Sequence, residues 1–232
     1  MIIILFEGVL DFLFFKSFFT KFLKFKNVGN EGNKEWFDKL LDYGYFEDLK
    51  NFDTSKIAVL REKGDKFEVM LISVGGKDSF KDAIRAFIEG HRILEKKIFG
   101  KIEKIIVVVD DDAKDKIGEI EKLVENKNLK DKFESLVLNG ELEDVVLLIY
   151  EVIKDRLNDN DKKAIKEFFD IISKRYDEDK EKHNKKRKVS ALHTAIGYRC
   201  YGHLFDELFE KFELDDLDNI EEFKKFYRIF KY

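Results

Sequence analysis

Apolar residues along this chain follow two kinds of pattern, one typical of strands and the other of helices. The runs 2–6 (IIILF) and 104–109 (KIIVVV) are short, almost continuous and rich in β-branched residues, as expected of strands covered on both faces. The stretch 57–74 alternates about a KGDK turn and predicts a hairpin. A further short strand is predicted over 134–138.

Helical periodicity occupies most of the remaining chain. It predicts helices over 9–25, 80–98, 114–127 and 140–153, then a helical region from about 160 to the end with breaks near 183–187 and 213–217. Strands alternating with helices favour an α/β fold with a mostly parallel sheet flanked by helices. We therefore predict an α/β domain over 1–155 and a helical C-terminal extension over 156–232. Within the domain, residues 27–66 form an insertion with a short helix and part of the hairpin.

Composition narrows the class of protein. Of the 232 residues, 44% are hydrophobic and 40% charged, and the single Cys200 permits no internal disulfide, which favours a reducing cytoplasm. The first 25 residues are apolar, but five charges interrupt them before the roughly 20 apolar residues that a membrane span needs. These charges are Glu7, Asp11, Lys16, Lys21 and Lys24. We therefore predict no membrane anchor.

Charge is distributed unevenly along the chain. The net charge of −4 argues against a general nucleic-acid coat protein. The run KHNKKRK at 182–188 nevertheless places five cations within one short segment, enough for a phosphate-contacting patch. A solvated helix end explains such a run equally well. The cations are Lys182, Lys185, Lys186, Arg187 and Lys188.

Acidic residues follow both continuous apolar runs. Glu7 follows the first, and Asp110, Asp111 and Asp112 follow the second. The carboxyl ends of parallel strands meet at one edge of the sheet, so we expect these acids to converge there. Asp110 and Asp112 are two apart in an extended chain and point the same way. Such a cluster repels itself unless a cation neutralises it, and oxygen ligands without His or Cys select Mg²⁺ or Mn²⁺. Capping of helix N-termini is the alternative role.

These motifs resemble those of the Toprim domain. EGVLD at 7–11 is similar to its opening, VVVDDDA at 107–113 to its DxD strand, and SVGGKDSFKDAI at 73–84 to its middle element. Together with GELED at 140–144 and the helical tail, they resemble small stand-alone Toprim-like proteins. These are related to the Toprim domains of overcoming-lysogenization-defect nucleases. The resemblance covers residues 1–155.

Toprim domains act on nucleic-acid phosphodiesters with Mg²⁺, so the resemblance implies roles for particular residues. Glu7 corresponds to the general acid/base, and Asp110 and Asp112 to metal ligands. Asp11 matches a position that supports a second metal in the nuclease branch. Glu143 and Asp144 are candidates to complete that second site. The chain lacks a recognisable topoisomerase tyrosine, the zinc-ribbon cysteines frequent in primases, and the ATPase domain of larger nucleases.

Two further motifs have less specific meanings. GGKDS at 75–79 lacks the first glycine and the Ser or Thr of a P-loop. We interpret it as a strand-to-helix turn in which Gly75, Gly76 and Lys77 face a phosphate. Separately, His193, Cys200 and His203 share one face of a continuous helix, but Gly197 and Gly202 weaken that helix and a fourth zinc ligand is not evident. We favour packing inside the helical tail over a zinc site.

The sequence thus predicts a cytoplasmic, nuclease-like protein that uses Glu7, Asp110 and Asp112 with Mg²⁺ or Mn²⁺ to process nucleic acid. The alternative is a non-catalytic nucleic-acid-binding or regulatory module on the same fold, with the 182–188 patch holding its partner.

Overall fold

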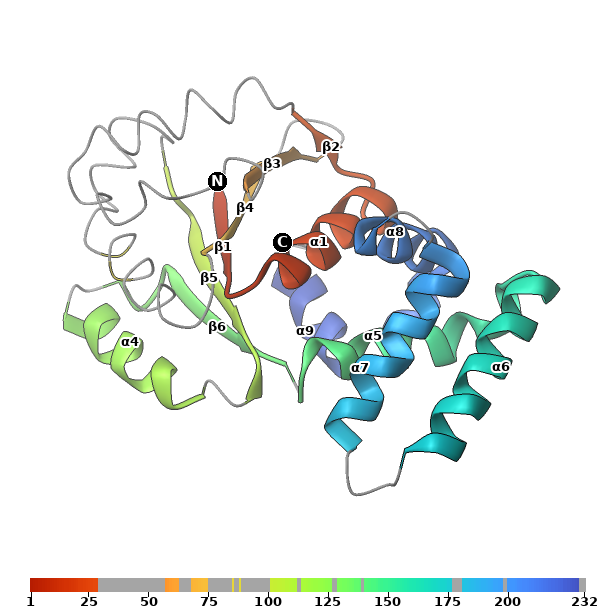
Figure 1. Ribbon diagram of the computed structural model, residues 1–232. Helices are drawn as coiled ribbons and strands as arrows, with labels where there is room; N and C mark the ends of the chain where they lie inside the picture. The colour runs from red at the N-terminus through yellow and green to blue at the C-terminus, as the bar shows by residue number, and fades with distance from the viewer. Residues whose placement is uncertain are drawn as a thin grey trace. The chain divides into compact units, whose positions relative to one another are not determined.

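Strands and helices alternate along the N-terminal part of the chain, and helices alone follow. The computed structural model describes residues 1–28, 57–62, 68–74, 85, 88, 101–111, 114–126, 129–138, 140–176, 181–197 and 200–229. By contacts the chain divides into two units, Met1–Val137 and Leu138–Tyr232. Figure 1 labels the elements of both.

The N-terminal unit contains a six-stranded sheet in the order β2-β3-β4-β1-β5-β6. β1, β4, β5 and β6 run parallel, and β3 is antiparallel to both β2 and β4. The strands are β1 (Ile2–Phe6), β2 (Lys26–Asn27), β3 (Ile57–Arg61), β4 (Glu68–Ser73), β5 (Lys104–Val109) and β6 (Phe133–Val137). The chain therefore has the α/β fold with a mostly parallel sheet that its sequence predicts.

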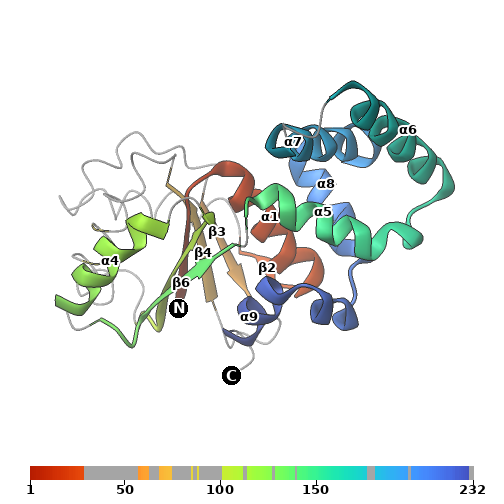
Figure 2. The ribbon, with the colours of Figure 1, turned by 90° about the horizontal axis from the view of Figure 1, so that it is seen from below.

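Two of the described helices, α1 (Val9–Ser17) and α4 (Lys114–Asn126), cover opposite faces of this sheet (Figure 2). One face forms a core cluster in which Ile3, Leu5 and Val107 pack with Ile117 and Ile120 of α4. The other face meets α1, which continues as the π-helical turn η1 (Phe18–Phe22). β1 and β5 are buried on both faces, which is why their sequences are continuous apolar runs rather than alternating ones.

Phenylalanines dominate the packing of α1 and η1. The Phe6 ring stacks on that of Phe15 with centroids 5.0 Å apart, and Phe19 meets Phe25 edge-on at 5.2 Å. Phe12, Phe15 and Phe19 are buried, which confirms the prediction that they belong to the core, whereas Phe22 is half-buried. Within the described residues, none of the helices combines the length and apolar character needed to cross a bilayer.

The C-terminal unit consists of helices. They are α5 (Leu142–Ile153), η6 (Lys154–Arg156), α6 (Asp159–Arg175), α7 (Glu181–Leu192), η8 (His193–Gly197), α8 (Tyr201–Lys211), η9 (Leu214–Asn219) and α9 (Glu221–Ile229). The rings of Phe209 and Phe223 meet edge-on at 5.8 Å inside this unit.

Several predicted boundaries differ from those observed. The units separate after Val137 rather than after residue 155, because α5 packs against α7 and α8 and so belongs with the C-terminal helices. The last strand begins one residue earlier than predicted, at Phe133. The predicted break at 183–187 is wrong, because α7 runs through these residues and their lysines meet acidic partners.

Other predictions concern residues outside the described ranges. Of the predicted insertion at 27–66, only its two ends are described, and its predicted short helix lies outside. Arg85 and Ile88 alone represent the predicted helix at 80–98.

Candidate functional site

The carboxyl ends of β1 and β5 lie side by side in the N-terminal unit. The two strands are parallel neighbours with Phe6 opposite Val108, so Glu7 and Asp110 each lie just beyond the end of their strand. Strand order could not be read from the sequence, but the predicted adjacency of these two acids is found here. A cleft of about 110 Å³ opens between them, lined by Glu7, Gly8, Asp11, Val108, Val109 and Asp110.

Asp11 enters the cleft from the first turn of α1. The backbone N–H of Gly8, the N-cap residue, donates to its Oδ2 over 3.1 Å, and the N–H of Phe12 donates to the Gly8 carbonyl over 3.2 Å. The carboxylate therefore caps the helix, in the way a capping box uses its N3 acid. Asp11 therefore caps α1 and lines the cleft at the same time.

The surroundings of Asp11 disfavour its charged form. Burial has the largest effect, and the neighbouring carboxylate of Asp110 adds to it, with a smaller contribution from Glu7. The hydrogen bond from Gly8 acts in the opposite direction because it stabilises the anion. Together these effects raise the pKa of Asp11 from 3.8 to about 7. Acidic groups with a pKa raised by burial and by neighbouring carboxylates are more frequent at functional sites than elsewhere.

The donor set around the cleft consists of carboxylates, which suits a hard cation such as Mg²⁺ or Mn²⁺. Within the described ranges, however, there is no group of three His, Cys, Asp or Glu side chains placed to hold a metal ion together. Asp112, the predicted metal ligand, lies outside the described residues, as do Gly75, Gly76 and Lys77 of the predicted phosphate-binding turn.

The acids of GELED lie in the C-terminal unit, at the start of α5. Asp144 Oδ2 accepts the backbone N–H of Glu141 over 3.0 Å and so caps α5 as Asp11 caps α1. Lys185 Nζ lies 2.8 Å from Asp144 Oδ1. Lys186 Nζ lies 3.9 Å from a Glu141 oxygen and 4.0 Å from a Glu143 oxygen. The predicted second-metal acids therefore have lysine partners within their own unit.

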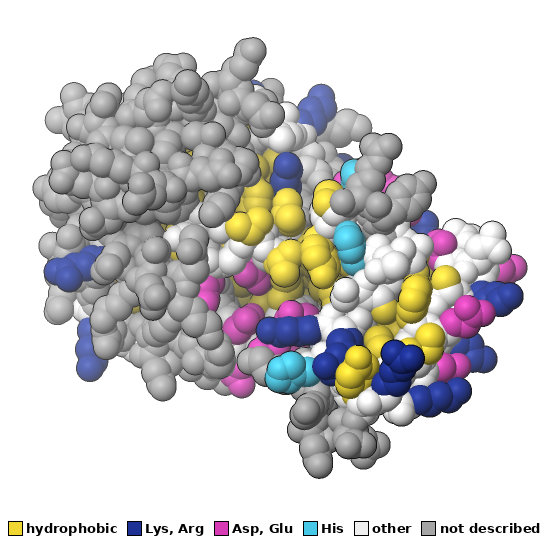
Figure 3. Space-filling view, viewed as in Figure 1, with side chains coloured by type: hydrophobic (Ala, Val, Ile, Leu, Met, Phe, Trp, Pro, Cys, Tyr) yellow, Lys and Arg dark blue, Asp and Glu magenta, His cyan; other side chains and the backbone are white. Residues whose placement is uncertain are grey.

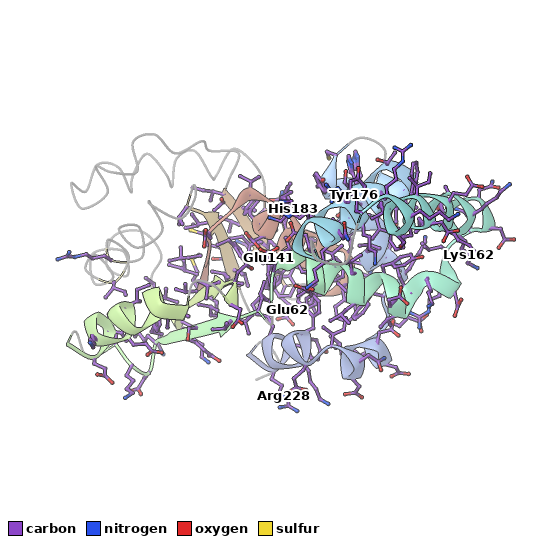
Figure 4. All side chains as sticks on the ribbon, turned by 60° about the horizontal axis from the view of Figure 1, so that its bottom comes forward. Glu62, Glu141, Lys162, Tyr176, His183 and Arg228 are labelled. Carbon is purple, nitrogen blue, oxygen red and sulfur yellow. The ribbon has the colours of Figure 1, made fainter. Side chains whose placement is uncertain are left out.

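The basic run contacts other parts of the C-terminal unit along much of its length. Besides the two paired lysines, the Arg187 guanidinium lies 3.6 Å from the centroid of the Tyr176 ring, and Lys188 Nζ lies 5.7 Å from that of Phe169. In Figure 4, Glu141 marks the start of α5, His183 that of α7, and Tyr176 the end of α6. The side chain of Lys182 is outside the described set.

The surface over these helices does not carry a single sign of charge. Figure 3 shows blue and magenta side chains intermingled over the C-terminal helices. Intermingled charges lower the local potential that a bound polyanion would experience.

His193, Cys200 and His203 do not lie on one helix face. α7 ends at Leu192, His193 begins the π-helical turn η8, and Cys200 is the N-cap of α8. Cys200 is exposed, so the prediction that all three pack inside the tail is wrong for this residue. Its Sγ lies 3.8 Å from Nδ1 of His203, while the His193 ring stacks on Tyr201 at 4.4 Å. The predicted continuous helix is therefore interrupted: η8 ends at Gly197, α8 begins at Tyr201, and Gly202 lies inside α8.

Sequence reasoning missed Gly8 as a member of the cleft. The available signal was its spacing: it precedes Asp11 by three positions, which is the spacing of an N-cap residue and its N3 acid.

Comparisons with known proteins support the fold. No protein-family model matches the chain, and no curated protein matches its sequence. Among solved structures, the chain is similar to the crystal structure of a hypothetical protein from Pyrococcus horikoshii OT3, with a TM-score of 0.57. The two sequences are 14% identical, and the match covers 97% of this chain and 93% of the other. The likeness concerns the α/β architecture together with its helical C-terminal part.

Proposed function

We propose that this protein processes nucleic-acid phosphodiesters with Mg²⁺ or Mn²⁺, as a nuclease-like, Toprim-like protein. The observation that carries the proposal is the cleft at the ends of β1 and β5 that the carboxylates of Glu7, Asp11 and Asp110 share. The raised pKa of Asp11 agrees with this arrangement. Burying a carboxylate beside other carboxylates costs stability unless a bound group neutralises their charge. A divalent cation is the simplest ligand that does so.

The proposed division of roles follows the positions of the acids. Asp110, just beyond the end of β5, holds the cation, and Asp112 is the second proposed ligand. Glu7, at the end of β1, exchanges a proton with the reacting oxygen, and Asp11 adds negative charge from α1. When bound, a divalent cation would polarise a phosphoryl oxygen and stabilise the leaving oxyanion.

The first test is a calorimetric Mn²⁺ titration of the wild-type protein beside Asp112→Asn and Glu7→Gln. We expect Asp112→Asn to weaken binding by about tenfold or more, since it removes a charged ligand. Glu7→Gln should leave affinity largely intact. Asp111→Asn is the matched control, because Asp111 is exposed and does not line the cleft. Absence of Mn²⁺ binding to the wild type, or equal loss in Glu7→Gln and Asp112→Asn, would contradict the proposal.

Turnover is tested separately on plasmid, single-stranded DNA and RNA. The proposed enzyme cleaves at least one of these substrates, loses activity in EDTA, and loses it again in Glu7→Gln with metal present.

The hydrogen bond from Gly8 to Asp11 gives this acid a structural role that needs no catalysis. It is therefore compatible with the second candidate, a non-catalytic nucleic-acid-binding or regulatory module. In such a module Asp11 serves as a helix cap and turnover is not required. Nucleic-acid binding without cleavage, unchanged in Glu7→Gln, would favour this module over the nuclease.

A further inference from the structure

Three of the described helices begin with the same arrangement of backbone and carboxylate. At the starts of α1, α5 and η9, the N–H of the N-cap residue donates to an aspartate three positions later, over 3.1, 3.0 and 2.7 Å. The N-cap residues have nearly the same backbone, with φ of −120°, −106° and −109° and ψ of 164°, 164° and 167°. They are Gly8, Glu141 and Glu213.

This comparison shows that forming the cap does not in itself require glycine at the N-cap position. Two of the three N-cap positions carry a glutamate, so the cap itself tolerates a Cβ atom. The φ of Gly8 is negative and open to any residue. The glycine at position 8 therefore has another cause.

The immediate surroundings of Gly8 supply that cause. A Cβ atom built on Gly8 would lie 2.8 Å from Oδ2 of Asp11, closer than real Cβ atoms approach an oxygen. The oxygen belongs to a short side chain already held by the Gly8 N–H, and both residues line the cleft. A Cβ atom at position 8 therefore requires the carboxylate that faces Glu7 and Asp110 to shift, whereas at Glu141 and Glu213 the capping aspartate already lies beside a residue with a Cβ atom.

We propose that Gly8 is a positioning residue: because it lacks a Cβ atom, the Asp11 carboxylate lies against the backbone of residue 8 and stays in the cleft. A consequence is that Gly8 tunes the affinity of the site for a divalent cation, and this part rests on the function proposed above. The geometric part stands without any metal.

The first experiment is a double-mutant cycle of urea unfolding in EDTA, with wild type, Gly8→Ala, Asp11→Ala and the double variant. We expect Gly8→Ala to lower the urea midpoint when Asp11 is present. When Asp11 is alanine, we expect the same change to leave the midpoint unchanged or raise it, since alanine restricts the unfolded chain. Equal effects of Gly8→Ala in both backgrounds would overturn the proposal.

Gly118→Ala is the matched control for the intrinsic effect of replacing glycine by alanine. Gly118 lies in α4, is exposed, and has nothing within 4 Å of the position of an added Cβ atom. We expect this substitution to raise the midpoint, as alanine does in helices.

The second experiment is a calorimetric Mn²⁺ titration of the wild type and Gly8→Ala at a temperature where both are folded. We expect affinity to fall by about tenfold, as it does when a group that orients a ligand is changed. Equal affinity would overturn the role of Gly8 in the site. If the wild type binds no Mn²⁺, the proposed function fails, and the unfolding cycle still decides whether Gly8 positions Asp11.

Discussion

Arg156 and Asp216 lie 60 positions apart in the sequence and form a two-pronged ion pair inside the C-terminal unit. Arg156 Nη2 donates to Asp216 Oδ1 over 2.9 Å, and Nη1 donates both to Oδ2 and to the Lys211 carbonyl. Asp216 is buried and also accepts the backbone N–H of Glu213 over 2.7 Å. The pair thus joins η6 to the end of α8 and to η9.

Removing the arginine should destabilise this unit. Arg156→Ala leaves a buried carboxylate without its partner, and we expect a loss of about 2 kcal/mol in the free energy of unfolding. Urea denaturation measures it. Lys154→Ala, which breaks the exposed ion pair with Glu151, is the control and should leave the midpoint nearly unchanged. The Arg156 guanidinium lowers the pKa of Asp216, so its contribution disappears as the pH falls below the ordinary value of 3.8. A deficit of Arg156→Ala that persists in acid would contradict this assignment.

Asp11 should make the protein less stable as the pH rises towards 8. Its pKa is about 7 when folded and 3.8 when unfolded, so between these values the folded state binds more protons than the unfolded state. Stability therefore falls with increasing pH across this window, by up to about 1.4 kcal/mol per pH unit. In Asp11→Asn the fall should be absent, while the amide oxygen still accepts the Gly8 N–H. Urea unfolding in EDTA from pH 5 to 8.5 compares the two proteins, and parallel curves would refute the prediction.

Metal binding should release a proton near neutral pH. A cation in the cleft favours the charged form of Asp11, which is partly protonated at pH 7 in its absence. Titrating Mn²⁺ in two buffers with different ionisation enthalpies measures the protons released. We expect roughly half a proton per ion at pH 7 and almost none at pH 8.5. Release that does not change with pH, or that survives in Asp11→Asn, would assign the proton to another group.

Replacing Lys24 by glycine should stabilise the protein. Lys24 follows Leu23, the C-cap residue of η1, and has a φ of 61°, in the left-handed region. Here the Phe25 N–H donates to the Phe19 carbonyl over 2.9 Å. Helices commonly end in this way at glycine, which has no Cβ penalty there. We expect Lys24→Gly to stabilise the protein by about 0.5–1 kcal/mol in urea unfolding. Lys16→Gly, inside α1, is the control and should destabilise by about 1 kcal/mol.

The acids of α5 should weaken any binding of nucleic acid by the basic run. Lys185 lies 2.8 Å from Asp144, so a phosphate must compete with that carboxylate. If the run contacts nucleic acid, Asp144→Asn should raise affinity several-fold, because it removes the competing charge and can still cap α5. Fluorescence anisotropy with a labelled oligonucleotide at two salt concentrations measures this. Unchanged affinity in both Asp144→Asn and Lys185→Ala would remove the run from the binding surface.

The strands and the acids that follow them were predictable because a strand buried on both faces has a continuous apolar sequence. Ile2–Phe6 and Lys104–Val109 read as continuous apolar runs, and parallel topology then brings Glu7 and Asp110 to one edge. The cap at Asp11 follows from local spacing, so it too could be anticipated.

Contacts between distant segments have no comparable pattern in the sequence. Lys185 and Asp144 belong to separate helices, and neither helical periodicity nor spacing predicts that they meet. For the same reason the predicted boundary at residue 155 lies later than the observed division of the two units. The amphipathic sequence of α5 does not tell which unit its apolar face packs against, and only its contacts with α7 and α8 assign it to the C-terminal unit.

The central position of β1 has a consequence for biosynthesis. This strand precedes the other strands of the sheet in the sequence, and its neighbours β4 and β5 follow much later in the chain. Glu7 and Asp110 can therefore become neighbours only after β5 has been synthesised. The carboxylates are brought together only when the last central strand docks, so their mutual repulsion opposes a late step of folding rather than its start.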